Sequence, residues 1–335
     1  MKKKDNTEID NALNNFPDNL TVLIKESLNS KNSIKKLAAR STLVRMGKTI
    51  IVPLDFSDES LTGLNLAMMM ANKTGANIQM VHVIGKNTGD YYEQMEKENQ
   101  LAKTKFEDIL QKCKAKGNIN CALNYTIKEG QIFKEIADLA DKYEDALTVL
   151  STHGASGFEE LFIGGNAYKI TSHSRNPVIT VRRSKMLSNI DKIVLPLDFT
   201  FQTREKVPYT AELARVFGSK IHILTISLSK LKSTVKKLHQ YAEQVASYLD
   251  NQKIPYTVEH LHGSNLTDLT LDYARSIDAD LISIMTEQEK SASNLLLGTY
   301  AHQFINKAFI PVLSFPNYHL RITAEDIWTL GAFNA

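Results

Sequence analysis

The stretch Thr49–Phe56 decides the fold of this chain: it reads TIIVPLDF and returns as KIVLPLDF at Lys192–Phe199. The two copies lie 143 residues apart (192 − 49 = 143), and the match continues without a gap to Gly75 and Gly218. A continuous apolar run of this kind is typical of a buried parallel strand, because helices cover both faces of such a strand. The chain therefore carries one α/β unit twice.

Further along, the offset between the copies falls to 134 residues, because Gly164 matches Gly298 (298 − 164 = 134) and Pro177 matches Pro311. The first copy thus has nine more residues in its middle than the second (143 − 134 = 9). Strand-like and helix-like segments alternate in both copies, which favours parallel sheets. We expect an α/β protein with two tandem doubly wound, Rossmann-like, mostly parallel five-stranded sheets flanked by helices.

Four regions follow from this repeat. We expect an N-terminal helical extension over residues 1–47, a first domain over 48–184, a second domain over 190–316 and a C-terminal tail over 317–335. The expected strands are 49–54, 78–84, 122–127, 147–150 and 177–181 in the first domain, then 192–197, 221–227, 256–260, 281–284 and 311–315 in the second. Pro208 falls inside the first helix expected in the second domain, and it should kink or delay that helix because proline has no N–H to donate.

Composition narrows the class of protein. The 335 residues are 43% hydrophobic and 23% charged, as in ordinary globular proteins. Forty basic against 37 acidic residues, without a concentrated basic face, gives no reason to expect nucleic acid. No run of about 18 apolar residues suggests a membrane span, and no apolar signal-peptide stretch follows the basic N-terminus. With two cysteines, Cys113 and Cys121, a reduced, cytoplasmic protein is the plain interpretation.

Ligands of such sheets bind outside the carboxyl ends of the strands, and three segments of the first copy should meet there. Asp55 follows the first strand, Val83 lies near the end of the second, and a glycine-rich loop from Ser151 to Asn166 follows the fourth. The backbone amides of glycines and the N-terminus of the next helix suit a phosphate. The Asp55 carboxylate could accept hydrogen bonds from a ribose hydroxyl or a base amine.

The tandem Pro-Leu-Asp-Phe strands, the His82–Val83 strand and the Thr-His-Gly loop that starts at Thr152 resemble the universal stress protein family in its two-domain form. The resemblance covers about residues 48–183 and 190–316. It implies that the loop holds the phosphates of ATP and that the first-strand aspartate and second-strand valine hold the adenosine. Mg²⁺ is expected only together with ATP. The residues expected to contact the nucleotide are Pro53, Asp55, Val83, Ser151, Thr152, His153, Gly154, Gly157, Gly164, Gly165 and Asn166.

The loop matches the family pattern imperfectly. Nucleotide-binding members carry Gly, two residues, Gly, nine residues, Gly, and then Ser or Thr. Here Ser151 stands at the first glycine position and Gly165 where a hydroxyl is expected, so one side-chain phosphate contact is missing. In the second copy Met285 and Gln288 replace the first two glycines, and we interpret this copy as having lost triphosphate binding. A second site for a smaller or uncharged ligand would use Asp198, Ile226, Gly298 and Thr299.

Each of these features has a structural alternative. The two aspartates could serve only to cap helices or to brace the strand ends, and the loop glycines could serve a tight turn and close helix packing. His153 is better explained as a solvated loop histidine. His260 and His262 resemble a metal pair only superficially, because no third ligand of suitable type is evident nearby, so no metal site is expected.

No catalytic set is recognisable, since the chain lacks a Walker-type phosphate motif and a Gly-x-Ser-x-Gly elbow. The leading hypothesis is a cytoplasmic stress-response protein, not an enzyme, that binds ATP in its first domain as a regulatory module. The main alternative is an interaction scaffold that binds no nucleotide, and a slow nucleotide hydrolase or adenylyl-transfer enzyme is the third. The resemblance also implies that the two domains pair as a pseudo-dimer across their last strands. We also expect that two chains could form a homodimer and that the protein has a protein partner of unknown identity.

Overall fold

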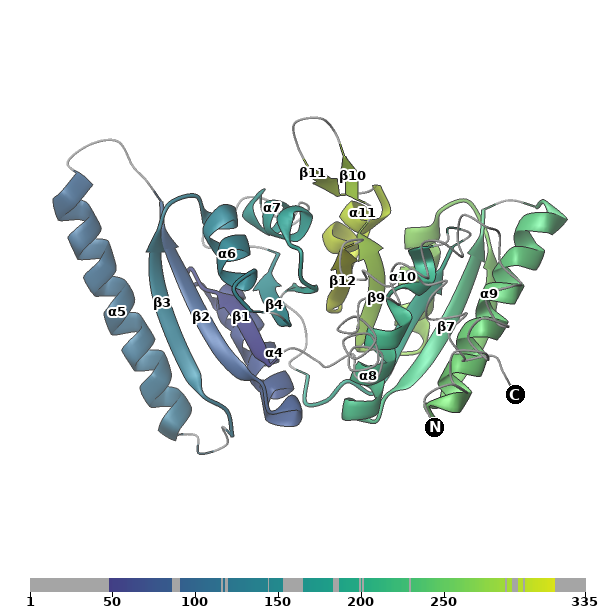
Figure 1. Cartoon of the computed structure of the whole chain (residues 1–335), viewed down its shortest axis with the longest axis horizontal. Coiled ribbons are helices and arrows are strands. Elements are labelled where there is room, and N and C mark those ends of the chain that lie inside the picture. Colours follow the sequence, from purple (N-terminus) through teal and green to yellow (C-terminus); the bar gives the residue numbers. More distant parts are fainter. Residues whose placement is uncertain are drawn as a thin grey trace, which may run out of the picture. The chain divides into compact units, whose positions relative to one another are not determined.

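Figure 1 shows the computed structural model of the chain, which describes residues 48–85, 91–115, 117, 120–143, 145–152, 165–182, 187–198, 200, 202–228, 230–286, 288–290, 295–297 and 299–316. The helical extension expected over 1–47 and the tail over 317–335 lie outside these residues.

The first repeat forms five parallel strands in the order β3-β2-β1-β4-β5. The register places Ile50 of β1 beside Ile78 on one side and Leu147 on the other. Its elements are β1 (Thr49–Pro53), α4 (Asp58–Thr74), β2 (Asn77–Ile84), α5 (Tyr91–Ala115), β3 (Leu123–Glu129), α6 (Ile132–Ala140), β4 (Ala146–Ser151), α7 (Gly165–His173) and β5 (Val178–Val181).

The second repeat has the same topology, with the order β12-β9-β6-β7-β8, and its strands are again parallel. Its elements are β6 (Lys192–Leu197), the 3₁₀ turn η1 (Gln202–Arg204), α8 (Val207–Phe217), β7 (Lys220–Ser227), α9 (Lys232–Asn251), β8 (Tyr256–His262), α10 (Leu266–Ser276), β9 (Leu281–Thr286), β10 (Gln288–Lys290), β11 (Leu295–Leu297), α11 (Thr299–Lys307) and β12 (Val312–Pro316). The strand bounds of both repeats differ from the expected ones by at most two residues.

The last strands of the two repeats pair with each other. β5 and β12 run antiparallel, with Ile179 opposite Leu313, and they join the two five-stranded halves into one ten-stranded sheet. The Arg182 guanidinium adds a hydrogen bond of 3.2 Å to the carbonyl oxygen of Asn306. The pairing expected between the last strands is therefore observed, as a continuous sheet.

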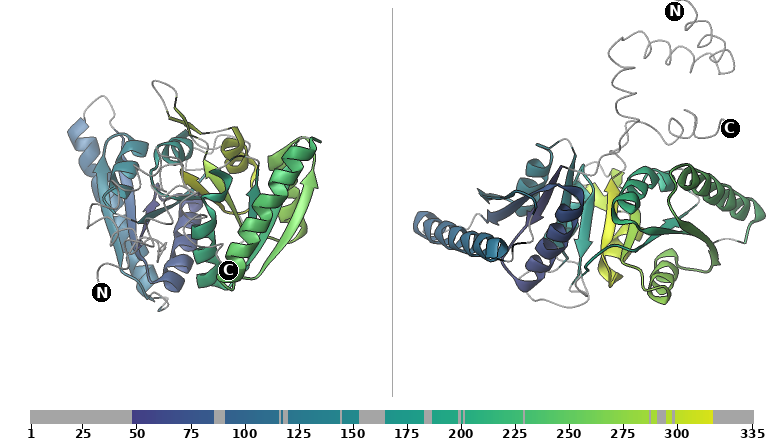
Figure 2. Two further views of the ribbon diagram at one scale, coloured as in Figure 1. Left: turned by 45° about the vertical axis from the view of Figure 1, so that its right-hand side comes forward. Right: turned by 90° about the horizontal axis from the view of Figure 1, so that it is seen from below.

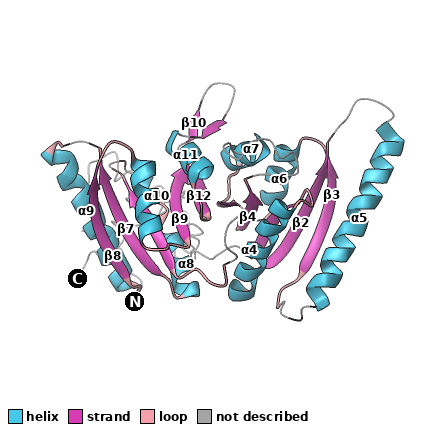
Figure 3. Ribbon diagram, turned by 180° about the vertical axis from the view of Figure 1, so that it is seen from behind, coloured by secondary structure: helices cyan, strands magenta, loops and turns pink. Residues whose placement is uncertain are grey.

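Helices lie on both faces of the sheet (Figures 2 and 3). Successive residues of β1 show why: Ile50 and Val52 pack in one cluster with α4 and α5, whereas Ile51 packs with α6 and α7. The first cluster continues into the second repeat under α8 and α9, while α10 and α11 cover the opposite face there. These β1 side chains are at most 1% exposed, and burying each one contributes about 1.5–3 kcal/mol. The doubly wound expectation is confirmed.

The first helices of the two repeats differ in length for a reason visible in the sequence. α4 begins after Ser57, whose Oγ accepts the Ser60 N–H at 3.1 Å, and it ends at Gly75 with φ 73°. α8 ends at the corresponding Gly218 with φ 72°, but it begins at Val207, six residues later than α4 would predict (58 + 143 = 201; 207 − 201 = 6). Pro208 lies at the start of α8, where its missing N–H leaves no helical bond unmade. The delay predicted from Pro208 is therefore observed.

One element was not expected from the sequence. β10 and β11 form a short antiparallel pair, with Gln288 opposite Leu297, between β9 and α11. Met285 and Gln288, which we expected at the glycine positions of a phosphate loop, thus belong to strands in this copy.

Candidate functional site

The candidate site of the first domain lies at the carboxyl ends of β1 and β4. The order β3-β2-β1-β4-β5 means that the connections leave these two neighbouring strands toward opposite edges of the sheet. Such a switch point leaves a crevice between the diverging connections. Asp55 follows β1 and Ser151 ends β4, so the structure brings these two predicted residues to adjacent strand ends.

Asp55 is exposed, and its carboxylate organises the turn that leads into α4. Its Oδ1 accepts the backbone N–H of Ser57 at 3.0 Å and the Ser57 hydroxyl at 2.5 Å. Since Ser57 is the N-cap of α4, the structural alternative for Asp55 is observed. A carboxylate has about four acceptor positions, so this bracing role is compatible with hydrogen bonds to a ligand.

Phe56, the residue after Asp55, helps to fix the course of the backbone at Asp55. Its backbone has φ 65°, a left-handed conformation that costs roughly 1–2 kcal/mol in a residue with a Cβ. The ring packs against His82 (4.8 Å between centroids) and Phe106 (5.0 Å), which offsets that cost. His82 in turn donates from Nδ1 to the carbonyl oxygen of Leu54 at 2.7 Å. The backbone on both sides of Asp55 is thus held by β2 and α5.

The other predicted contacts are placed as follows. Pro53 is half-buried at the end of β1, and Val83 is 8% exposed within the apolar cluster under α6 and α7. Thr152 is buried, and its N–H extends the sheet by donating to the Val181 carbonyl oxygen at 3.0 Å. Gly165 and Asn166 are exposed at the start of α7. His153, Gly154, Gly157 and Gly164 lie outside the described residues.

Gly63 lies beside the candidate site and was not predicted from the sequence. It lies on the buried side of α4, and a Cβ built on it would stand 3.5 Å from the backbone nitrogen of Ser151, at the end of β4. The helix therefore passes close to the strand end without a side chain between them. Because α4 and α8 share the offset of 143, the residue that corresponds to Gly63 in the second domain is Lys206 (206 − 143 = 63).

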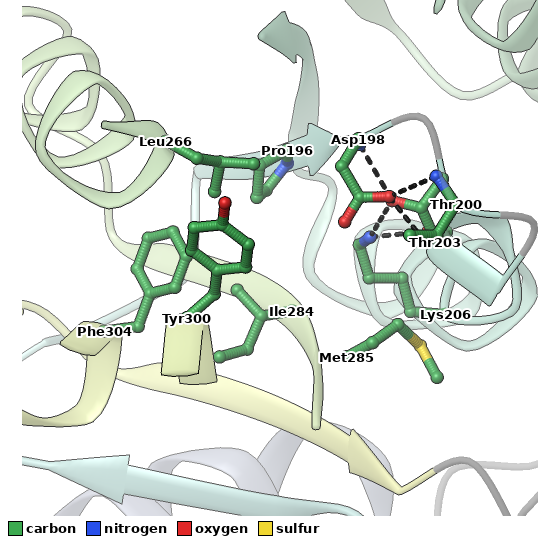
Figure 4. A pocket seen from close by; sticks show the side chains of 10 residues that line it. All are labelled: Pro196, Asp198, Thr200, Thr203, Lys206, Leu266, Ile284, Met285, Tyr300 and Phe304. Atoms are coloured by element: carbon green, nitrogen blue, oxygen red, sulfur yellow. Dashed lines mark hydrogen bonds between the residues drawn. The ribbon is translucent and has the colours of Figure 1, made fainter. Parts of the chain in front are cut away.

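The second domain has a cavity of about 70 Å³ at the equivalent switch point, between the ends of β6 and β9 (Figure 4). Asp198 repeats the geometry of Asp55: its Oδ1 accepts the Thr200 N–H at 2.7 Å and the Thr200 hydroxyl at 2.5 Å. The N–H of Asp198 donates to the Thr203 hydroxyl at 3.1 Å. The aspartate thus has the bracing role that we considered for it, and it also lines the cavity.

Lys206 reaches this cavity from the turn before α8 although it is only 2% exposed. Its Nζ donates to the carbonyl oxygen of Thr203 at 2.5 Å and to the Thr203 hydroxyl at 3.3 Å. Burial lowers the pKa of the ammonium from its ordinary 10.5 to about 8, although the carboxylates of Asp198 and Glu205 oppose the shift. An ammonium is expensive to bury, so its presence at this position needs a reason.

The rest of the cavity wall is mainly apolar. It is formed by the start of α10, the end of β9 and one side of α11, with the side chains of Leu266, Ile284, Met285, Tyr300 and Phe304. Met285, which replaces a loop glycine, thus lines the cavity. Ile226 is buried in the neighbouring apolar cluster and does not line the cavity. Thr299 begins α11, while Gly298 lies outside the described residues.

Two further properties of the described residues concern other classes of site. Among those residues, no group of three or more His, Cys, Asp or Glu side chains is arranged to hold a metal ion. His260 instead stacks on His239, with 4.0 Å between the ring centroids, and shares a 2.6 Å hydrogen bond with the Thr225 hydroxyl. None of the described helices combines the length and apolar character that crossing a membrane requires.

Comparison with known proteins relates this geometry to a family. The model of the universal stress protein family matches residues 46–182 and 189–316. Universal stress protein MJ0531 of Methanocaldococcus jannaschii is 26% identical over 156 residues, which are 43% of this chain and 90% of that protein.

Two solved structures share the fold. A universal stress protein from Archaeoglobus fulgidus has a TM-score of 0.67 at 18% identity, over 81% of this chain and 98% of that one. A putative universal stress protein from Pseudomonas aeruginosa has a TM-score of 0.61 at 14% identity, over 85% of this chain and 99% of that one. At identities this low, the two structures show a shared fold and nothing further. Because the family model matches both repeats, and with them most of the sequence, this chain belongs to the universal stress protein family.

Proposed function

We propose that the first domain binds ATP, that the second domain does not, and that the protein is a cytoplasmic stress-response module regulated by this binding. The observation that carries the proposal is the contrast between Gly63 and Lys206 at equivalent places. Close approach of backbone amides is what a phosphate cradle needs. In the first domain Gly63 adds no side chain beside the end of β4, whereas the residue at the same place in the second repeat is a lysine that lines the cavity.

The described residues of the first domain fit an adenine nucleotide in three ways. Asp55 is an exposed carboxylate that can accept a ribose hydroxyl or a base amine. Gly165 and Asn166 begin α7, so their N–H groups lie at the positive end of a helix, which favours phosphate. Ser151 ends β4, the strand next to β1, and it lies between Asp55 and Gly165 in the sequence. Mg²⁺ would enter with the phosphates and not on its own.

The proposal describes a binding module. Phosphoryl transfer requires a carboxylate that holds a metal ion and a second group that positions the nucleophile. We assign Asp55 to the nucleoside, and its Oδ1 is already engaged with Ser57. We therefore expect ATP to act by setting the conformation of the loop between β4 and α7, with hydrolysis slow and incidental.

The first experiment identifies small molecules released by denaturing the protein purified from cells, and then titrates the ligand-free protein with ATP. The variant Gly63→Lys copies the second domain into the first and should abolish ATP binding, and circular dichroism checks that the variant is folded. A Cβ at this position meets the neighbouring backbone at ordinary van der Waals distance. Asn65→Lys adds the same charge to the same helix and is the matched control.

Adenine nucleotide in near-stoichiometric amount, or ATP binding that Gly63→Lys removes and Asn65→Lys preserves, supports the proposal. An empty protein that binds no ATP at millimolar concentration would sink it and favour the interaction scaffold. ATP binding that survives Gly63→Lys would place the nucleotide elsewhere. Rapid metal-dependent turnover that disappears in Asp55→Ala would favour the nucleotide hydrolase.

A further inference from the structure

The cavity of the second domain has a polar end and an apolar end (Figure 4). Asp198, Thr200, Thr203 and Lys206 gather at one end, and Leu266, Ile284, Tyr300 and Phe304 form the other. A pocket that is largely apolar, with a few convergent polar groups, is the general form of a small-molecule site. Its occupant should therefore combine a charged head with a short apolar body.

At the polar end, Lys206 has a donor to spare. An ammonium carries three N–H groups, and within the described part of the chain Lys206 directs two hydrogen bonds, both to oxygens of Thr203. The carboxylates of Asp198 and Glu205 influence it electrostatically, but neither is among its hydrogen-bond partners there. A buried ammonium bonded only to neutral oxygens attracts an anionic acceptor, because pairing offsets the cost of its desolvation.

Asp198 supplies the complementary charge at the same end. Both hydrogen bonds that it accepts from Thr200 fall on Oδ1, and its Oδ2 accepts none from the described residues. A simple anion bound at Lys206 would leave this carboxylate oxygen close to a like charge, which is unfavourable. A ligand that carries an anion and a cationic donor together satisfies both side chains.

The size of the cavity limits the rest of the ligand. A volume of about 70 Å³ corresponds to roughly five water-sized sites at ~10–15 Å³ each. Pockets for larger organic ligands usually exceed about 300 Å³, so an adenine nucleotide does not fit. A charged head with a body of a few methyl or methylene groups does.

From the paired charges, the apolar wall and the volume we infer that the second domain binds a small aliphatic α-amino acid. Its carboxylate accepts from Lys206, its ammonium donates to Asp198, and its side chain contacts Leu266, Ile284 and Phe304. Valine and alanine represent the class. This inference goes beyond ATP binding by the first domain and does not depend on it.

The test is calorimetric titration of the full chain with L-valine and with two analogues that each lack one charge. 2-Hydroxyisovalerate keeps the carboxylate without the ammonium, and isobutylamine keeps the amine without the carboxylate. We expect valine to bind, and each analogue to bind about tenfold or more weakly, because each leaves one charged side chain without its partner.

Variants assign the binding to this cavity. Lys206→Met and Asp198→Asn should each weaken valine binding by about tenfold or more, while both remain folded by circular dichroism. Asn keeps an oxygen that can accept the Thr200 bonds, so Asp198→Asn removes the charge with little change of the turn. Lys236→Met, at an exposed position of α9, removes the same charge elsewhere and should leave valine binding unchanged.

Three results would overturn the inference. Absence of binding for alanine and valine at millimolar concentration would exclude the site. Equal binding of 2-hydroxyisovalerate would show that the ammonium contributes nothing, and displacement of valine by ATP in the Gly63→Lys variant would show a nucleotide site in the second domain. Valine binding in a protein that binds no ATP would leave this inference standing while the proposed function fails.

Discussion

At the scale of single residues, the two domains keep the same aspartate and differ in what lies beside it. Asp55 and Asp198 each accept two hydrogen bonds from the residue two positions on. The sequence predicts both positions, because both follow the repeated strand. Gly63 lies beside the end of β4 in the first domain, and Lys206 lines the cavity of the second, and we propose that they decide what each crevice can hold.

Lys206 should make the stability of the protein depend on pH in a direction opposite to that of an ordinary paired lysine. Its pKa is about 8 in the folded protein and 10.5 in its ordinary state, so the unfolded chain binds more protons between these values. Stability therefore rises with pH across that window. The difference of 2.5 units (10.5 − 8) corresponds to about 3 kcal/mol that Lys206 costs the fold below pH 8.

The variant Lys206→Met removes this cost, so it should be more stable than the parent at neutral pH. Its advantage should shrink as the pH rises from 8 through 10.5, because only above 10.5 is the parent lysine mostly neutral in both states. Urea denaturation across this range measures the difference. An advantage that stays constant with pH would mean that Lys206 is paired more strongly than its contacts indicate.

Sequence reasoning missed Lys206 because lysine is normally a surface residue and because the expected phosphate-binding motif consists of glycines. The information was nevertheless present in the repeat, since the ungapped alignment places Lys206 opposite Gly63. What the sequence could not show is that the lysine is buried, which depends on the packing of β9 and α11 around it.

At the scale of elements, strands and helices follow the sequence closely because each has a local cause. The apolar runs fix the strands, and proline and glycine fix both ends of α8. The pair β10–β11 was missed because its strands have three residues each and no alternating apolar pattern. Residues 86–90 and 153–164 lie outside the described residues, so the predicted contacts of His153, Gly154, Gly157 and Gly164 stay predictions.

Ser57 is only partly buried, but it should contribute clearly to the stability of the fold, because it links the Asp55 turn to α4. Its Oγ accepts the Ser60 N–H at 3.1 Å and donates to Asp55 at 2.5 Å. Ser57→Ala removes both bonds and should lower the free energy of unfolding by about 1–2 kcal/mol. Thr62→Ala is the control, since the Thr62 hydroxyl only returns to the Asp58 carbonyl oxygen within the helix. Urea denaturation that separates the two variants by less than the error would contradict the capping role.

At the scale of the whole molecule, the seam between β5 and β12 joins the two repeats through one sheet and one apolar cluster. Ile179 and Leu313 face each other across it at 1% and 0% exposure, and both belong to the apolar cluster that continues through both domains. The resemblance predicted that the last strands pair. That one cluster continues across the seam follows from the packing of α4 and α8, which no local pattern encodes.

Leu313→Ala should therefore affect both domains at once. Removing this buried side chain should cost about 2–5 kcal/mol, and calorimetry should show the single transition of the parent broadening or splitting into two. Leu101→Ala, at a 56% exposed position of α5, is the control and should keep one transition. A parent that already melts in two separate steps would show that the seam does not couple the repeats.

The covalent link between β5 and β6 has a consequence for how this protein can evolve. Paired domains on separate chains dissociate on dilution and reassemble at random, so a copy that changed its ligand would be mixed with unchanged ones. Within one chain the effective concentration of the partner is fixed by the linker, and every molecule contains one domain of each kind. The second domain could therefore exchange glycine for lysine without diluting the first, and a change in one domain always accompanies an unchanged partner domain in the same molecule.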